Sequence, residues 1–201
     1  IGKKINLEKI KYWTTLPVFD TEILSIDCSG NGKTTNDDCA IGYLGRNSNG
    51  YYLGDFISTK LNYNQTKQAV RDFIDKYPTI QYLIIEEKVL GIALVEEMRY
   101  EFPNLIVIGV VPVTNKMNRL NEVSDPFENE QVWFEDPAQN FSVYSVLDQF
   151  KKFTGSAKDK DDIIDVISQG IKFLMENEYQ ATIFEDDLNF IKSYRDIISV
   201  A

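Results

Sequence analysis

Apolar residues recur along the chain at two spacings, and these spacings predict an order of strands and helices. Short runs of β-branched and aromatic residues, bounded by turn signals such as the Asn-Ser-Asn-Gly at 47–50, predict strands. The predicted strands cover residues 22–27, 39–45, 51–57, 79–85 and 105–111, with a further short strand at 132–134. Apolar residues at helical spacing predict helices over residues 64–77, 89–100, 141–153, 161–175 and, in the tail, 184–200.

Three successive antiparallel strands followed by alternating helix and strand favour a mixed α/β sheet with helices on both faces. This order, β-β-β-α-β-α-β-α, is the ribonuclease H-like arrangement. The strand at 105–111 is apolar throughout, so we expect it to be covered on both faces. The chain begins with Ile1 rather than Met, and we expect it to be a piece of a longer protein. We divide it into a lead-in or linker (1–20), a ribonuclease H-like domain (21–176) and a tail helix (177–201).

Composition narrows the class of function more than it narrows the fold. The chain has 201 residues, 43% of them hydrophobic, and no apolar run approaches the ~20 residues that span a bilayer. We therefore expect one well-cored domain and no membrane association. Histidine is absent from the sequence, which excludes a Ser-His-Asp triad and a Cys-His pair. Two cysteines cannot build a disulfide scaffold or a usual zinc site, so a cytosolic setting is the simpler interpretation.

The formal net charge of −10 disfavours general affinity for nucleic acids, because that affinity comes from Lys and Arg side chains that neutralise phosphates. The simplest interpretation of the charge is a solubilising acidic surface. The other interpretation is that part of the excess is a cluster of carboxylates that binds divalent cations. Composition alone does not separate the two.

Three groups of acidic residues follow predicted strands or open a predicted helix. Asp27 ends the first strand, and Glu86 ends the strand at 79–85. If these strands are parallel neighbours, both carboxylates lie at the end of the sheet where open α/β sheets place their sites. The third group opens the helix at 161–175. There Asp162 and Asp165 are i and i+3 and share a face, with Asp161 at its margin.

Each group also has a plainer interpretation. The amides of the following loop could satisfy Asp27, Glu86 could be an ordinary loop carboxylate, and the third group could complement a helix dipole. Brought to one point, however, the carboxylates would repel and raise each other's pKa values, and a hard divalent cation would remove that cost. Ligation by oxygen alone favours Mg²⁺ or Mn²⁺. Two such ions ~4 Å apart can activate a water and stabilise the leaving oxygen in phosphodiester cleavage.

A nearby glycine-rich segment resembles the end of a nucleotide-binding loop but does not complete the motif. Residues 30–34 are Gly-Asn-Gly-Lys-Thr, and the motif needs a further glycine five residues before Gly32. Asp27 stands at that position instead, so we interpret the segment as a loop over the site.

Taken together, these residues resemble the C-terminal nuclease domain of the large terminase subunit of tailed bacteriophages, over about residues 12–173. The Ile-Asp-Cys-Ser-Gly around Asp27 is similar to the family's first acidic motif, and Asp38 lies where a second aspartate often follows the loop. Glu86, with a glycine five residues on, resembles the acid that ends a strand in the family. The Lys-Asp-Asp-Ile-Ile-Asp-Val that begins at Lys160 resembles the last motif, commonly His-Asp-Asp-x-x-Asp-Ala, with lysine in place of histidine.

The resemblance implies a metal-dependent endonuclease that cleaves double-stranded viral DNA during genome packaging, by two-metal phosphodiester hydrolysis. The implied catalytic residues, which would also hold one or two Mg²⁺ or Mn²⁺ ions, are Asp27, Glu86, Asp162 and Asp165. Asp38 and Asp161 are outer candidates for the metal. The candidate phosphate contacts are the basic residues Lys33, Lys116, Arg119, Lys158 and Lys160.

The implied partners are double-stranded DNA, the portal protein, the small terminase subunit and an ATPase domain N-terminal to this chain, all meeting at the capsid portal in the host cytoplasm. Two alternatives stay open. One is an acidic docking or assembly module of the packaging motor, with residues 184–201 as a candidate contact. The other is a different ribonuclease H-like nuclease, such as a Holliday-junction resolvase or a transposase.

Overall fold

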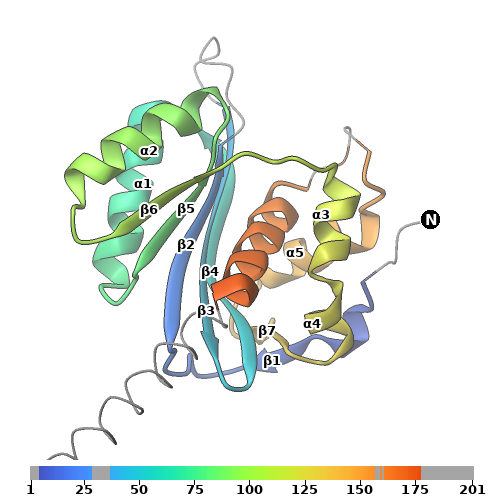
Figure 1. Ribbon diagram of the computed structural model, residues 1–201. Helices are drawn as coiled ribbons and strands as arrows, with labels where there is room; N and C mark the ends of the chain where they lie inside the picture. Colours follow the sequence, from blue (N-terminus) through green and yellow to red (C-terminus); the bar gives the residue numbers. More distant parts are fainter. Residues whose placement is uncertain (1–4, 29–36, 157–158, 160, 178–201) are drawn as a thin grey trace, which may run out of the picture.

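A seven-stranded mixed sheet with helices on both faces forms the body of the protein (Figure 1). The computed structural model describes residues 5–28, 37–156, 159 and 161–177. Its strands are β1 (Lys11–Trp13), β2 (Thr21–Cys28), β3 (Asp37–Asn47), β4 (Gly50–Leu61), β5 (Tyr82–Glu86), β6 (Ile106–Val110) and β7 (Val132–Glu135). Its helices are η1 (Leu7–Lys9), α1 (Tyr63–Lys76), α2 (Val89–Glu101), α3 (Lys116–Glu122), α4 (Ser124–Glu128), α5 (Val143–Lys152) and a helix over residues 162–177. Among these described helices, none is both long and apolar enough to cross a membrane.

The strand order β1-β7-β4-β3-β2-β5-β6 places β2 between β3 and β5. β2, β3 and β4 pair antiparallel, whereas β5 pairs parallel with β2, and β6 pairs parallel with β5. This arrangement confirms the predicted fold class of three antiparallel strands followed by alternating helix and strand. β7 and β1 extend the sheet beyond β4 by parallel pairing.

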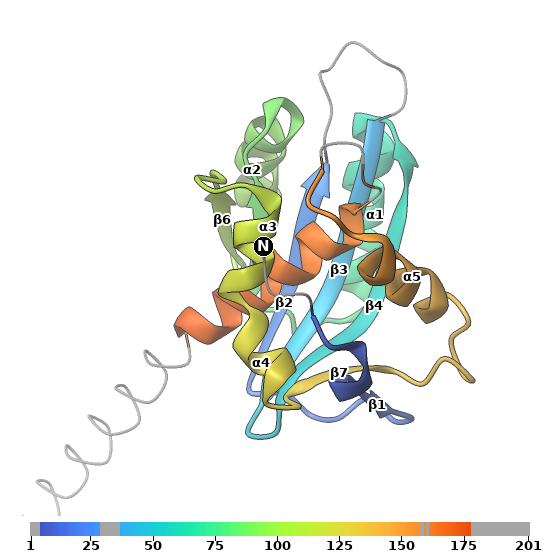
Figure 2. The same ribbon diagram turned by 90° about the vertical axis from the view of Figure 1, so that its right-hand side faces the viewer.

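Two hydrophobic cores lie on opposite faces of the sheet. Successive side chains of a strand point to opposite faces, so Ile23 belongs to one core and Leu24 to the other. α1 and α2 cover the core that contains Leu24, and α5 with the helix 162–177 covers the core that contains Ile23 (Figures 1 and 2). Every residue of β2 after Thr21 is buried in consequence. The strand that carries Asp27 is therefore covered on both faces.

Three segments differ from the prediction. No helix was predicted between the strands at 105–111 and 132–134, but α3 and α4 form there; at 7 and 5 residues they are too short to show a clear helical period. β6 is an edge strand with Ile106 54% exposed, so the expectation of cover on both faces was wrong. β1, within the expected lead-in, pairs with β7 and so belongs to the sheet. The tail helix predicted at 184–200 lies outside the described residues.

One covalent crosslink was not expected from the sequence. Cys28 at the end of β2 and Cys39 in β3 are opposite each other in the antiparallel register and form a disulfide. The two cysteines make no scaffold of several bridges, but this single bond closes the loop that separates β2 from β3. It lies directly beside Asp27 in the chain.

Candidate active site

The carboxylates of Asp27 and Glu86 come from the C-terminal ends of the neighbouring parallel strands β2 and β5. The register aligns Ile26 with Ile85, so the next residue of each strand brings its carboxylate to the same end of the sheet. Both residues are buried, with exposed fractions of 7% and 3%. The sequence argument required these strands to be parallel neighbours, and they are. We refer to these two residues as the Asp27–Glu86 pair.

The connection from β5 into α2 is unusually close and holds Glu86 in place. A Cβ atom at Gly91 would lie 1.9 Å from the backbone carbonyl oxygen of Glu86, so a residue with a side chain does not fit there. The backbone N–H of Lys88 also donates to that carbonyl, at 2.9 Å. The glycine five residues after the acid thus has a packing reason, because it lets the first turn of α2 lie against the end of β5.

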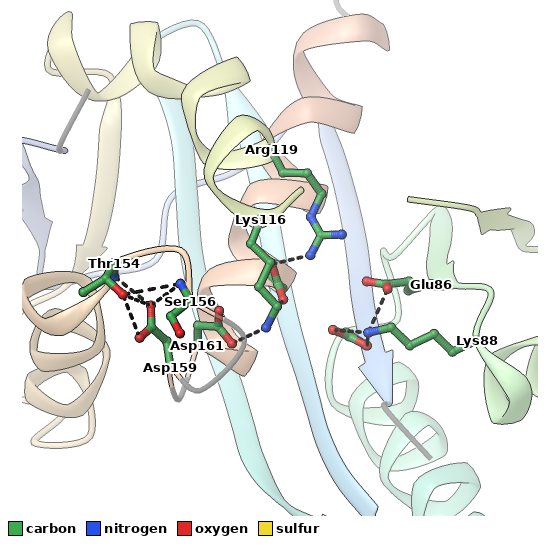
Figure 3. A network of polar contacts seen from close by, with 10 residues as sticks. Glu86, Lys88, Lys116, Arg119, Thr154, Ser156, Asp159 and Asp161 are labelled. Carbon is green, nitrogen blue, oxygen red and sulfur yellow. Dashed lines mark hydrogen bonds and ion pairs between the residues drawn. The ribbon is translucent and has the colours of Figure 1, made fainter. Parts of the chain in front are cut away.

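The ammonium of Lys88 lies between the two carboxylates (Figure 3). Its Nζ is 3.1 and 3.3 Å from the two carboxylate oxygens of Asp27. It is also 2.8 Å from Oε1 of Glu86 and forms an ion pair with it, but the angles at this contact do not satisfy hydrogen-bond geometry. Two adjacent buried carboxylates repel, and Lys88 neutralises one of the two charges.

A second acidic pair, Asp161 and Asp165, faces the first from the start of the helix 162–177. Lys116, at the first turn of α3, contacts Asp161 Oδ1 at 2.5 Å and Asp165 Oδ2 at 3.3 Å. Arg119, one turn later, donates to Asp165 Oδ1 at 2.7 Å. Figure 3 shows Lys116 and Arg119 descending from α3 toward this group, opposite Glu86 and Lys88. The Asp161–Asp165 pair is therefore held by two cations.

Direct contacts fix the helix 162–177 to the strands that carry the first pair. The hydroxyl of Ser25 in β2 donates to the carbonyl of Val166 at 2.8 Å. The side-chain amide of Gln169 donates to the carbonyl of Ile84 at 3.1 Å and to that of Ile26 at 3.4 Å, linking β5 and β2. These bonds lie one turn from Asp165, so they position the second pair over the ends of β2 and β5.

Glu86 and Asp165, one carboxylate from each acidic pair, line a cavity of about 130 Å³. The strand side of its wall includes Glu86, and the helix side includes Arg119 and Asp165, with apolar residues 110–113 closing one end. The site is therefore a small cleft between the end of the sheet and α3. Its mixed charge arises from carboxylates on both sides and cations bound to them.

Burial and mutual repulsion perturb the acids of this cleft. Burial first, and then the Glu86 carboxylate, raise the pKa of Asp27 from 3.8 to about 6, although Lys88 opposes the change. Burial, with a further contribution from Asp165, likewise raises the pKa of Asp161 against the effect of Lys116. Burial alone would lower the pKa of Lys88, but Asp27 and Glu86 outweigh it, so the net pKa is raised and the ammonium stays charged. Perturbed acids in a cleft are characteristic of functional sites.

The four carboxylates are chemically suited to a hard divalent cation, although the described side chains are not arranged around a metal position. The four carboxylates offer only oxygen ligands, which suit Mg²⁺ or Mn²⁺. Glu86 Oε1 and Asp161 Oδ2 are buried and accept no hydrogen bond. Among the described residues, however, no group of three or more acidic, histidine or cysteine side chains converges closely enough to hold an ion. A cation would need the lysine ammonium groups to move.

The remaining predicted site residues lie at varied distances from this cleft. Asp162 begins the helix 162–177 and is half-buried, whereas Asp161, expected at the margin, is the residue that shares Lys116 with Asp165. Asp159, which was not a predicted site residue, accepts hydrogen bonds from the backbone N–H and the hydroxyl of Thr154 (Figure 3). Asp38 lies in β3 opposite Lys60 in the register. Three predicted phosphate contacts lie outside the described residues: Lys33, Lys158 and Lys160.

Two residues of the site were not identified from the sequence. Lys88 follows the acidic motif directly, and a lysine two residues after a strand-ending acid is a signal that could have suggested an ion pair. Gln169 carries no such signal, because its role depends on the helix 162–177 lying across β2 and β5.

Comparison with known proteins agrees with this architecture. The family model described as the terminase RNaseH-like domain matches residues 24–173, which include both acidic pairs. A search of curated proteins gave no match.

Solved structures of terminases share the fold at low sequence identity. A large terminase from a thermophilic bacteriophage is 12% identical with a TM-score of 0.61, over 85% of this chain and 44% of that chain. The present chain thus spans less than half of that protein. The large terminase nuclease of the thermophilic phage G20c with bound magnesium is 13% identical with a TM-score of 0.54, over 81% and 92% of the two chains.

A terminase from an animal virus has the same fold. The human cytomegalovirus terminase nuclease domain, manganese-soaked and inhibitor-bound, is 11% identical with a TM-score of 0.56, over 85% of this chain and 94% of that chain. At these identities the structures establish the fold, and the family model establishes the relationship. The chain belongs to the terminase RNase H-like domain family.

Proposed function

We propose that this chain is a divalent-metal-dependent nuclease domain that cleaves double-stranded DNA during viral genome packaging. One observation carries the proposal: two buried carboxylate pairs lie together at the end of a ribonuclease H-like sheet, and one carboxylate of each pair lines the same small cleft. Membership of the terminase family and the nuclease domains that share the fold give the cleft its reaction class. The domain contains no histidine, so hydrolysis here relies on carboxylates and metal.

The proposed ligands of one or two Mg²⁺ or Mn²⁺ ions are the four buried carboxylates of the site, Asp27, Glu86, Asp161 and Asp165, with Asp162 and Asp38 as further candidates. Solved relatives with magnesium bound or soaked with manganese support this choice. The ions would supply Lewis acidity for two-metal phosphodiester hydrolysis. The burial of Asp27 and Glu86 strengthens their attraction for a cation, because water screens that attraction less there.

The basic residues of the cleft have a role on the substrate side. Arg119 presents a guanidinium that matches a phosphate in its planar, two-pronged geometry, and Lys116 offers a compact charge beside it. Both are bound to carboxylates. A cation held by those carboxylates would free Lys116 and Arg119 to bind DNA phosphates. The freed side chains would place positive charge at the cleft of a chain whose net charge is −10.

The family also suggests a setting. We propose that the domain follows an ATPase domain in the full-length large terminase subunit and meets the portal protein and the small subunit in the host cytoplasm. The large terminase of the thermophilic bacteriophage described above, of which this chain matches 44%, supports the existence of a longer chain.

The test is plasmid nicking in the presence of Mn²⁺ by the wild type and by an Asp27→Asn variant. We expect the variant to lose activity by at least about 10²-fold, because it removes a charged ligand from the metal. The control is Asp148→Asn, which removes an exposed carboxylate on α5 that is paired with Lys152 in the same helix. Full nicking activity in Asp27→Asn would overturn the assignment of the site.

A further inference from the structure

Lys88 is the cation that the Asp27–Glu86 pair holds most closely. Its Nζ contacts three carboxylate oxygens at 2.8, 3.1 and 3.3 Å. The two acidic side chains are only 8% and 4% exposed, whereas the lysine side chain is 36% exposed. The stem of Lys88 therefore runs along the surface while its ammonium is inserted between two buried groups.

The position of Lys88 in the chain makes this contact unexpected on local grounds. It is the N-cap residue of α2, and its side chain makes no capping hydrogen bond. A cation at the N-terminus of a helix is disfavoured by the helix dipole, which concentrates partial positive charge there. The two carboxylates are thus the interaction that accounts for where the ammonium lies.

The backbone of Lys88 is fixed, so only its side chain is free to move. Its N–H donates to the Glu86 carbonyl at 2.9 Å, and its own carbonyl accepts from Ile92 at 3.0 Å. The close approach of Gly91 to Glu86 holds the same turn against β5. Four rotatable bonds remain between this fixed backbone and the ammonium, and the partial exposure of the side chain gives it space to turn outward.

The second acidic pair is arranged differently. Asp165 is bonded to Arg119 as well as to Lys116, so it keeps a positive partner if the lysine moves. Within the described part of the chain, Lys88 is the only basic residue in an ion pair with Asp27 or Glu86. The charge balance of the first pair therefore depends on one mobile side chain.

We propose that Lys88 competes with a divalent cation for the oxygens of Asp27 and Glu86 and thereby sets the metal concentration at which the site is loaded. The inference rests on the proposed function, because it assumes that these carboxylates bind metal. Mg²⁺ binds oxygen at about 2.0–2.1 Å, and an ammonium in contact with the same oxygens occupies that space. The two cations are therefore mutually exclusive, and Lys88 is a positioning residue for metal loading.

The size of the effect follows from the fraction of molecules in which Lys88 has turned away. The apparent dissociation constant of the metal is the intrinsic constant divided by that fraction, so a side chain in contact for about nine-tenths of the time weakens binding about tenfold. Removing the ammonium abolishes the competition. It also leaves two buried carboxylates without their cation, which destabilises the metal-free protein.

The experiment titrates the 201-residue chain with Mn²⁺ and measures the concentration of free Mn²⁺ by electron paramagnetic resonance, which reports binding directly. We expect Lys88→Met and Lys88→Gln to bind Mn²⁺ at least about tenfold more tightly than wild type. The matched control is Lys172→Met, which removes one positive charge from the same cavity but breaks ion pairs with Glu122 and Glu176 instead. We expect its affinity to stay within about threefold of wild type, since exposed charges are screened.

A second measurement, thermal unfolding, shows whether the Lys88 variant is folded and whether Mn²⁺ stabilises it. Thermal unfolding without metal should show a lower midpoint for Lys88→Met, and saturating Mn²⁺ should raise that midpoint by more than it raises the wild-type value. Unchanged or weaker Mn²⁺ binding in both Lys88 variants, with normal binding by wild type, overturns the competition alone. Absence of Mn²⁺ binding in every protein, wild type included, overturns both the competition and the proposed function.

Discussion

Asparagine in place of Asp27 should stabilise the metal-free protein, although the same change removes a proposed metal ligand. Burial and the Glu86 carboxylate raise the pKa of Asp27 to about 6 from 3.8, so the ionised form is disfavoured in the folded state. The difference of about 2 pH units corresponds to about 3 kcal/mol between the two protonation states. Asparagine resembles the uncharged form in shape, and we expect about 2 kcal/mol of added stability, or about 4–8 °C in the unfolding midpoint.

The gain should depend on pH in a defined direction. Because the folded pKa of Asp27 lies above the unfolded value, the native state binds more protons between about pH 4 and pH 6. The wild-type contribution from this group is therefore intact below about pH 4 and is lost as the pH rises through about 6. Asp27→Asn does not titrate, so its advantage over wild type should be absent near pH 4 and complete above about pH 7.

The assay is urea unfolding with a chelator present, for the wild type, Asp27→Asn and Asp148→Asn, at both ends of this pH range. Asp148 is exposed and paired within its own helix, so its replacement should change stability by no more than about 0.5 kcal/mol. If Asp27→Asn is less stable than wild type at the higher pH, or gains equally at the lower one, the electrostatic reasoning fails. A stabilised variant that does not nick DNA would also show that its lost activity is not lost folding.

Two further predictions concern the framework around the site. Gly91→Ala should lower the free energy of unfolding by about 1–3 kcal/mol, because the added Cβ would clash with the Glu86 carbonyl. The control Ile92→Ala, on the exposed side of α2, should lower it by less than about 1 kcal/mol. Equal losses for the two variants in urea unfolding would contradict the packing argument. Reduction of the Cys28–Cys39 disulfide should lower the free energy of unfolding by about 3 kcal/mol, because the bond closes a loop with a sequence separation of 11. A variant with serine at both positions should show this lower stability with or without reductant. A thiol titration that finds both cysteines free in the unreduced wild type would count against the bond.

The sequence was sufficient to predict the strands β2 to β6 and the acidic end of the sheet, but not β1. The apolar runs before Asp27 and Glu86 are long enough to identify buried strands, and the order of the elements makes those strands parallel neighbours. The register then follows without further information, since both acids come directly after their apolar runs. α3 and α4 were missed because helices of 7 and 5 residues contain too few turns to reveal a period.

The ion pairs between the cations and the carboxylates of the site could not be predicted in the same way, although the resemblance had named Lys116 and Arg119 as candidate phosphate contacts. Lys116 reaches Asp161 from a different helix, and the contact depends on how α3 crosses the helix 162–177. The choice between Asp161 and Asp162 has the same origin, because both are one turn from Asp165 in sequence and the position of α3 decides which of them Lys116 contacts. Local periodicity describes the face of one element and says nothing about the angle at which a second element meets it.

The order of the site residues along the chain has a consequence for biosynthesis. Asp27 and Glu86 lie in the first half of the sequence, whereas Asp161 and Asp165 lie at the start of the helix 162–177, the last one described. Val166 and Gln169 of this helix form hydrogen bonds with β2. Contacts between segments so distant in sequence form late, since the intervening chain must first be ordered. A ribosome-bound or truncated chain that ends before Asp161 therefore carries only half of the carboxylates. Under the proposed function, a nascent chain has no competent nuclease until the domain is almost completely translated.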